Sequence, residues 1–172
     1  MTRNWLGPLL AVAAIVAVIV LARYFFSAGS MNTQDLPYEH ARGNPLALRE
    51  LKRRPYDPLL SAAFRRMAAD PDPKVRQAAL LYLAKGTEPA EEAVLIAALS
   101  DQVPEVRATA ATACDQRRLK RAVGPLIALL EDPSVEVMAA AQAALMRITG
   151  RRHYMNRSEW EEWWRLHREG FD

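Results

Sequence analysis

The stretch DPDPKVRQAALLYL (residues 70–83) returns with few changes as DQVPEVRATAATAC (101–114) and DPSVEVMAAAQAAL (132–145). The copies begin 31 residues apart, and each opens on an aspartate. A fixed period of this size is the sequence signature of a repeat architecture. The apolar positions that the copies share are Val75, Val106 and Val137; Ala79, Ala110 and Ala141; and Leu83, Cys114 and Leu145.

Within each copy, apolar residues recur three and four positions apart, which is the period of an amphipathic helix. A second apolar set lies upstream of each copy: Phe64, Leu95 and Leu126, then Ala68, Leu99 and Leu130. Each unit is therefore predicted to be a pair of helices joined by short turns. The first helices are expected near 73–84, 104–115 and 135–148, their partners near 58–69, 89–100 and 123–131, and a further first helix near 44–53.

A helix pair this short cannot bury its apolar face alone, so neighbouring pairs must stack. The small alanines at the shared positions allow the helices to approach closely. The predicted fold is all-α: a right-handed α-solenoid of about four helical hairpins over residues 44–150, with one N-terminal transmembrane helix.

The pattern Asp-x-x-Pro-x-Val-Arg-x-x-Ala, present in DPDPKVRQAA and DQVPEVRATA, resembles the HEAT repeat, and the short period is similar to its phycobilisome-lyase-like subtype. The third copy departs from the pattern, because Met138 replaces the arginine and Val135 the proline. The resemblance implies a non-catalytic scaffold or accessory subunit that binds another protein. It also permits a second reading, a helper in chromophore attachment.

Residues 5–22 carry no charge, and the aromatic residues Tyr24, Phe25 and Phe26 follow them. At 1.5 Å per residue, a helix from Trp5 to Phe26 would be roughly 33 Å long, enough to cross a bilayer. We expect residues 1–26 to be a single-pass anchor in a bacterial inner or plasma membrane. A cleaved signal peptide and a buried core helix are the alternatives, and the flanking charges do not decide the orientation.

Residues 27–43 show no helical period and contain Gly, Pro, Ser and Asn, which predicts a linker with His40 as a solvated loop residue. At the other end, residues 151–172 leave the repeat pattern. Ser158 and Glu161 have capping-box spacing, so a last helix is expected to start at Glu159. Its tryptophans, Trp160, Trp163 and Trp164, are predicted to cover the end of the solenoid; the alternative is an aromatic anchor for a partner.

No catalytic, cofactor-binding or metal-binding pattern is found in the sequence, and we expect no enzyme and no cofactor. Cys114 takes the place of Leu83 and Leu145 and is predicted to fill the core. The adjacent acids Glu91 and Glu92 are expected to be solvated.

Charge follows the turns of the predicted repeats. Acidic residues cluster where the first helices begin, and basic residues cluster where they end. Favourable interaction of these charges with the helix dipole is enough to explain this pattern. The segment DQRRLKR (115–121) is more basic than that explanation needs. A basic edge could meet an acidic protein or anionic lipid, whereas nucleic acid fits poorly with a formal net charge of +3. The candidate partner-binding residues are Arg117, Arg118, Lys120, Arg121, Arg151, Arg152, Trp160, Trp163 and Trp164.

Overall fold

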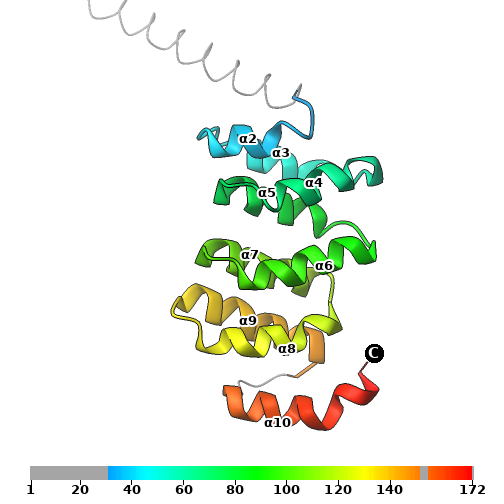
Figure 1. Cartoon of the computed structure of the whole chain (residues 1–172), viewed down its shortest axis with the longest axis vertical. Helices are drawn as coiled ribbons and strands as arrows, with labels where there is room; N and C mark the ends of the chain where they lie inside the picture. The colour runs from blue at the N-terminus through cyan, green and yellow to red at the C-terminus, as the bar shows by residue number, and fades with distance from the viewer. Residues whose placement is uncertain (1–30, 152–154, 172) are drawn as a thin grey trace, which may run out of the picture.

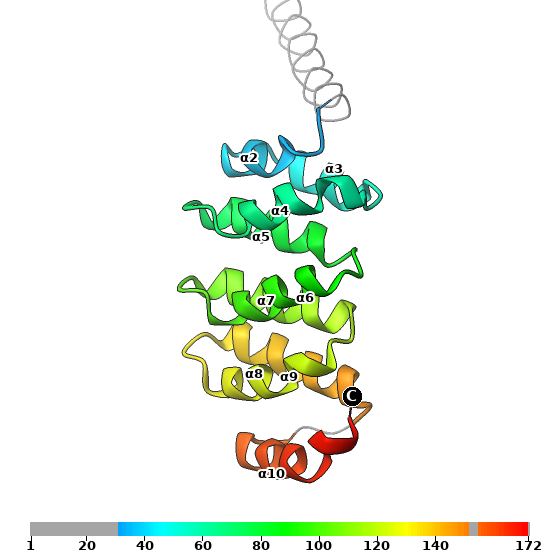
Figure 2. The same cartoon turned by 45° about the vertical axis from the view of Figure 1, so that its right-hand side comes forward.

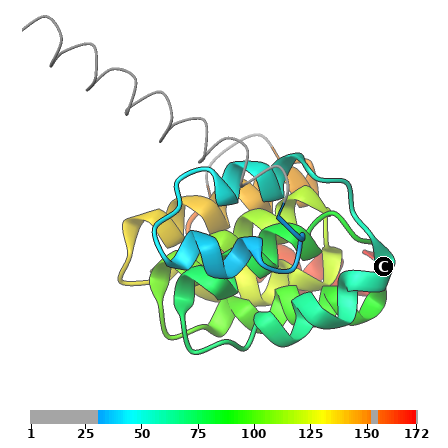
Figure 3. The same ribbon diagram turned by 90° about the horizontal axis from the view of Figure 1, so that it is seen from above.

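A computed structural model of the chain describes residues 31–151 and 155–171. The described helices form a single stack that runs from α2 at one end to α10 at the other (Figure 1), and the same order is seen after a 45° turn (Figure 2). Seen along the stack, the helices largely overlap (Figure 3). The described residues contain helices and turns and no strand, so the prediction of an all-α fold of stacked helices is confirmed for this part of the chain.

The helix pairs match the predicted units closely. Short 3-10 turns precede or extend several of them, at Pro58–Leu60, Ala98–Ser100, Lys120–Ala122, Leu129–Glu131 and Arg168–Gly170. The α-helices are α2 (Leu36–Ala41), α3 (Ala47–Arg53), α4 (Ser61–Met67), α5 (Pro73–Leu83), α6 (Pro89–Ala97), α7 (Pro104–Gln116), α8 (Val123–Ala128), α9 (Val135–Thr149) and α10 (Arg157–His167).

The aspartate that opens each copy shapes the turn into the following helix. The Oδ1 atoms of Asp70, Asp101 and Asp132 each accept a hydrogen bond, 2.9 Å long, from the backbone N–H two residues further on. This side-chain turn satisfies a backbone donor just before the helix begins. Proline then occupies the first position of α5 and α7, where a missing N–H costs nothing.

The arginine of the repeat pattern joins each unit to the next. Arg76 donates two hydrogen bonds, both 2.8 Å long, to the carboxylate of Asp101, and Arg107 does the same to Asp132 at 2.7 and 2.8 Å. Both guanidinium groups also donate to backbone carbonyls of their own turn, Asp70 O and Asp101 O, at 2.8 Å. The result is an Asp–Arg ladder along one edge of the stack. It ends at the third copy, because Met138 has no charge to continue it.

The ladder predicts a loss of stability in acid. Burial opposes ionisation of Asp101, but hydrogen bonds from Arg76 and Val103 N–H outweigh it and lower the pKa of Asp101; the hydrogen bonds from Arg107 lower the pKa of Asp132. A carboxylate with a lowered pKa stabilises the fold above about pH 4, and that contribution disappears as the pH falls through the lowered pKa. Arg107→Gln should therefore move acid unfolding to higher pH and cost about 1–3 kcal/mol at neutral pH.

Circular dichroism along an acid titration measures this shift. Arg66→Gln is the matched control, because Arg66 is exposed on α4 and forms no ion pair with a described residue. An acid midpoint that moves equally in both variants would contradict the structural role of the ladder.

The shared alanines lie on α5, α7 and α9, and α7 packs between the other two helices. Ala79, Ala110 and Ala141 are all fully buried, as the repeat register predicts. Cys114 is also fully buried, and burial raises the pKa of its thiol to about 12. The prediction that this cysteine fills the core is confirmed.

The structure differs from the sequence prediction in the segment that was expected to be a linker. Residues Leu36–Ala41 form α2, which packs on α5 and α3, and Leu36 is fully buried. His40 lies on this helix and is half-buried rather than solvated; burial lowers its pKa, as do Lys74 and Lys52, against an opposing contribution from Asp72. The repeat domain therefore begins earlier than residue 44.

The last helix also begins earlier than expected. The N-cap of α10 is Asn156, whose side chain accepts from Glu159 N–H at 3.0 Å while the Glu159 carboxylate accepts from Asn156 N–H at 2.7 Å. This is a capping box, but it is built by Asn156 and Glu159 and not by Ser158 and Glu161.

The predicted anchor, Trp5–Phe26, lies outside the described residues. Among the residues that are described, no helix has the length and apolar character needed to cross a membrane.

Candidate protein-binding site

The tryptophans of α10 cover the last repeat. Trp160 is fully buried, and its indole N–H donates to Gln142 Oε1 of α9 over 3.2 Å. Trp163 is 8% exposed and meets Trp160 edge-to-face, with ring centroids 5.7 Å apart. These two rings act as a cap, as the capping interpretation predicts, and they are not available to a partner.

Trp164 packs between these rings and α8 and belongs to a more open aromatic cluster. It is half-buried, and its ring meets Phe171 edge-to-face at 5.7 Å. The ammonium of Lys120 lies 5.4 Å from the centroid of Phe171, and the guanidinium of Arg151 lies 5.2 Å from that of Trp163. Cations over aromatic faces are attracted by the ring quadrupole, so basic and aromatic side chains are interleaved at this end of the stack.

Among the predicted basic residues, Arg118, Lys120 and Arg121 are exposed. Arg118 follows the C-cap of α7 and has φ +50°, in the left-handed region. None of the three forms an ion pair with a described residue. Arg151 is half-buried, and Arg152 lies outside the described residues.

Arg117 has a different role from the one expected of it. Its side chain is 9% exposed, and its Nη1 atom lies 3.8 Å from the Oε2 atom of Glu91. That nitrogen has no hydrogen-bond partner, while Nη2 donates to Glu88 O over 3.5 Å. Arg117 is thus part of the interior and not of a docking edge.

Glu91 is the centre of this buried polar cluster, so the expectation that it is solvated was wrong. It is fully buried, and its Oε1 atom accepts hydrogen bonds from the hydroxyls of Tyr56 and Ser61, the latter at 2.7 Å. Its Oε2 atom accepts from Glu88 N–H at 3.2 Å. The absence of a side chain at Gly86 makes the room, because a Cβ there would lie 1.9 Å from Oε2.

Sequence reasoning missed two further arginines, Arg165 and Arg168, which are exposed on and just after α10. With Gly124, Ile127 and Ala128 of α8 and Trp164 they line a groove of about 290 Å³ between α8 and α10, and Arg157 and Glu161 complete its wall. Helical spacing could have identified these arginines in the sequence, because residues 157, 161, 164, 165 and 168 fall on one face of a helix.

The comparison with known families decides what the repeats are. Residues 92–154, from α6 to just beyond α9, match the family described as HEAT repeats. This match and the stacked helix pairs together support a HEAT-repeat protein. In a comparison with curated proteins no match was found.

HEAT repeats generally mediate protein–protein interactions. The matched residues include the second and third copies of the Asp turn and one rung of the ladder, Arg107–Asp132. The first copy lies outside the match but has the same turn, at Asp70, and the same kind of rung, Arg76–Asp101. Among the described residues of this HEAT stack, no three His, Cys, Asp or Glu side chains gather in a way that could hold a metal ion.

Proposed function

We propose that the protein is a non-catalytic HEAT-repeat scaffold or accessory subunit, which an N-terminal helix over Trp5–Phe26 anchors in a membrane and which binds a protein partner through its C-terminal end. One observation supports the choice of that end. Exposed cations that form no ion pair with a described residue lie there beside half-buried aromatic rings: Lys120 beside Phe171, and Arg165 and Arg168 in the groove that Trp164 lines. Arginine and tryptophan at a surface are the residues that most often dominate binding energy.

The other charged turns support the choice by contrast. The acids Asp101 and Asp132 are engaged in the ladder, and Lys85 donates to Leu51 O and Arg54 O at 2.7 and 2.6 Å. Arg147 pairs with Asp115. These charges at the turns of the repeats therefore serve the fold, whereas Lys120, Arg165 and Arg168 at the C-terminal end form no ion pair with a described residue.

Membrane attachment predicts how the chain fractionates. The full chain should sediment with membranes and resist extraction by high salt and alkaline carbonate, because about 20 apolar residues in a bilayer hold it irreversibly. A chain that lacks residues 5–26 should move to the supernatant. A mature protein whose N-terminus lies near Ser30 would contradict the anchor and favour a cleaved signal peptide.

Partner binding is tested by affinity purification of the full chain from native membranes in mild detergent. One protein that co-purifies stoichiometrically supports the scaffold. A bound pigment would instead support a role in chromophore attachment. Co-purified nucleic acid would support nucleic-acid binding through the basic edge.

A further inference from the structure

The groove between α8 and α10 has an apolar floor and a cationic rim. Its floor consists of Gly124, Ile127 and Ala128 on one side and the indole of Trp164 on the other. On α8 these residues are three and four positions apart, so they share one face of the helix. The groove thus lies at the surface of the last repeat, where one face of α8 meets one face of α10.

The positive charge at the rim is not neutralised within the described chain. Arg157 is more than balanced, because its single positive charge pairs with two carboxylates, those of Glu131 and Glu161. Arg165 and Arg168 have no carboxylate within ion-pair distance among the described residues, although α10 also carries Glu159 and Glu162. Two guanidinium groups therefore border the groove with all their donors available.

The indole of Trp164 adds a donor to the same groove. Its Nε1 atom would lie 3.6 Å from a Cβ atom at Gly124, which places the N–H against α8 at the groove floor. It forms no hydrogen bond with a described residue, in contrast to Trp160, whose N–H is used by Gln142. The groove thus offers donors from three side chains and apolar contact beneath them.

We infer that this groove binds an acidic segment of a protein partner, in which carboxylates alternate with apolar residues. Carboxylates accept hydrogen bonds from guanidinium groups in a bidentate manner, and a small apolar side chain suits a floor of Gly, Ala and Ile. This inference rests on the proposed function and names the chemistry of the partner and the residues that recognise it.

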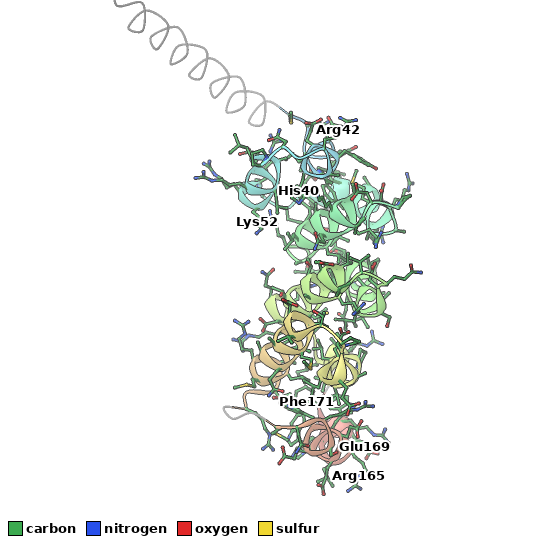
Figure 4. The ribbon with its side chains drawn as sticks, turned by 90° about the vertical axis from the view of Figure 1, so that its left-hand side faces the viewer. His40, Arg42, Lys52, Arg165, Glu169 and Phe171 are labelled. Carbon is green, nitrogen blue, oxygen red and sulfur yellow. The ribbon has the colours of Figure 1, made fainter. Side chains whose placement is uncertain are left out.

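The position of the groove favours a protein segment over lipid head groups. Arg165, Glu169 and Phe171 lie at one end of the stack, and Arg42 of the α2 end lies at the other (Figure 4). The first described residue, Met31, precedes α2, so a membrane anchor before it would hold the end of the stack that is remote from the groove (Figure 1).

Binding of a defined probe to the full chain in mild detergent tests the inference. The probe is a fluorescent peptide with the core Glu-Ala-Asp-Ala-Glu flanked by Gly and Ser, and its reference is the same peptide with Gln and Asn in place of the acids. We expect saturable binding of the acidic peptide only, with an affinity that falls several-fold between about 50 and 300 mM salt because the charges are exposed.

Two variants separate charge from shape. Arg165→Gln together with Arg168→Gln should weaken binding by about tenfold or more, and Ala128→Tyr should do the same by filling the groove without changing the charge. Arg49→Gln with Arg53→Gln on α3 is the matched control, since both are exposed and without an ion pair among the described residues. Unchanged circular dichroism and thermal midpoints show that the variants are folded.

Several results would overturn the inference. They are no binding of the acidic peptide to the wild-type chain, equal weakening by the α3 control, or binding to phosphatidylserine vesicles that depends on Arg165 and Arg168 while the peptide does not bind. If a native partner still co-purifies with the Arg165→Gln, Arg168→Gln variant, the proposed function stands and the groove is not the site. If no partner co-purifies with the wild-type chain, it is the proposed function that fails.

Discussion

Glu91→Ala is expected to lower the free energy of unfolding by about 3–5 kcal/mol. The substitution removes the acceptor of the Tyr56 and Ser61 hydroxyls and leaves the guanidinium of Arg117 in the interior without its anion. A buried donor that loses its partner keeps its full desolvation cost, and a buried charge costs more than a neutral group. The cluster joins α4, α6 and the end of α7, so the loss weakens the contact between successive repeats.

Thermal and urea unfolding of the full chain in detergent measure this effect. The neighbouring substitution Glu92→Ala is the control and should cost only a few tenths of a kcal/mol, since Glu92 is only half-buried and forms no ion pair with a described residue. Glu91→Gln should fall between the two, because an amide keeps one acceptor but turns a donor toward Glu88 N–H. Equal stability of the Glu91→Ala and Glu92→Ala variants would show that the buried cluster is misplaced.

Ala110→Arg should be the most damaging single substitution in the repeats. Ala110 is fully buried on α7, which packs against both α5 and α9, and no space exists there for a long side chain. Overpacking alone costs about 1–3 kcal/mol, and a buried unpaired charge adds several more. Since a small domain is stable by only about 5–15 kcal/mol, we expect a chain that is largely unfolded at 37 °C.

Thr112→Arg is the matched control for this substitution. Thr112 lies on the exposed face of the same helix, and its hydroxyl only donates back to Ala108 O. This variant should keep the wild-type thermal midpoint within a few degrees. A midpoint for Ala110→Arg as high as that of Thr112→Arg would mean that the repeat register is wrong.

The repeat units could be predicted from the sequence because their signals are local. The period of 31 residues, the helical spacing and the Asp-Pro turns each describe a short segment, and together they predict the bounds of α5, α7 and α9 to within one or two residues. The Asp–Arg ladder could not be predicted from such local signals. Arg76 reaches Asp101, which is 25 residues away in the sequence, and only the stacking of units brings the two together.

The missed features depend on such distant contacts. Helix α2 has only six residues, so its helical order comes from packing on α5 and not from propensity. Glu91 resembles an ordinary acidic residue in the first turn of a helix. Its burial depends on the space left by Gly86 and on the hydroxyl of Tyr56, 35 residues away.

The candidate site was predicted in part. The sequence pointed to the basic turn after α7 and to the tryptophans of the last helix, and the structure brings Lys120 of that turn together with Phe171, which follows the last helix and was not predicted. It could not distinguish Arg117, which is buried, from Arg118, which is exposed, because both follow α7 directly. Which cations are free depends on the acids that each one meets across the stack.

Site-specific photo-crosslinking in native membranes tests the central claim most directly, that the α10 end of an anchored HEAT stack holds a protein partner. A photoreactive residue is placed at Glu169, next to Arg168 of the groove, or at Arg49 on α3, toward the other end of the stack. We predict one protein adduct from position 169, with the crosslinked peptide rich in Asp and Glu, and no such adduct from position 49. Adducts of equal yield from both positions, or crosslinks from position 169 to lipid alone, would contradict the account.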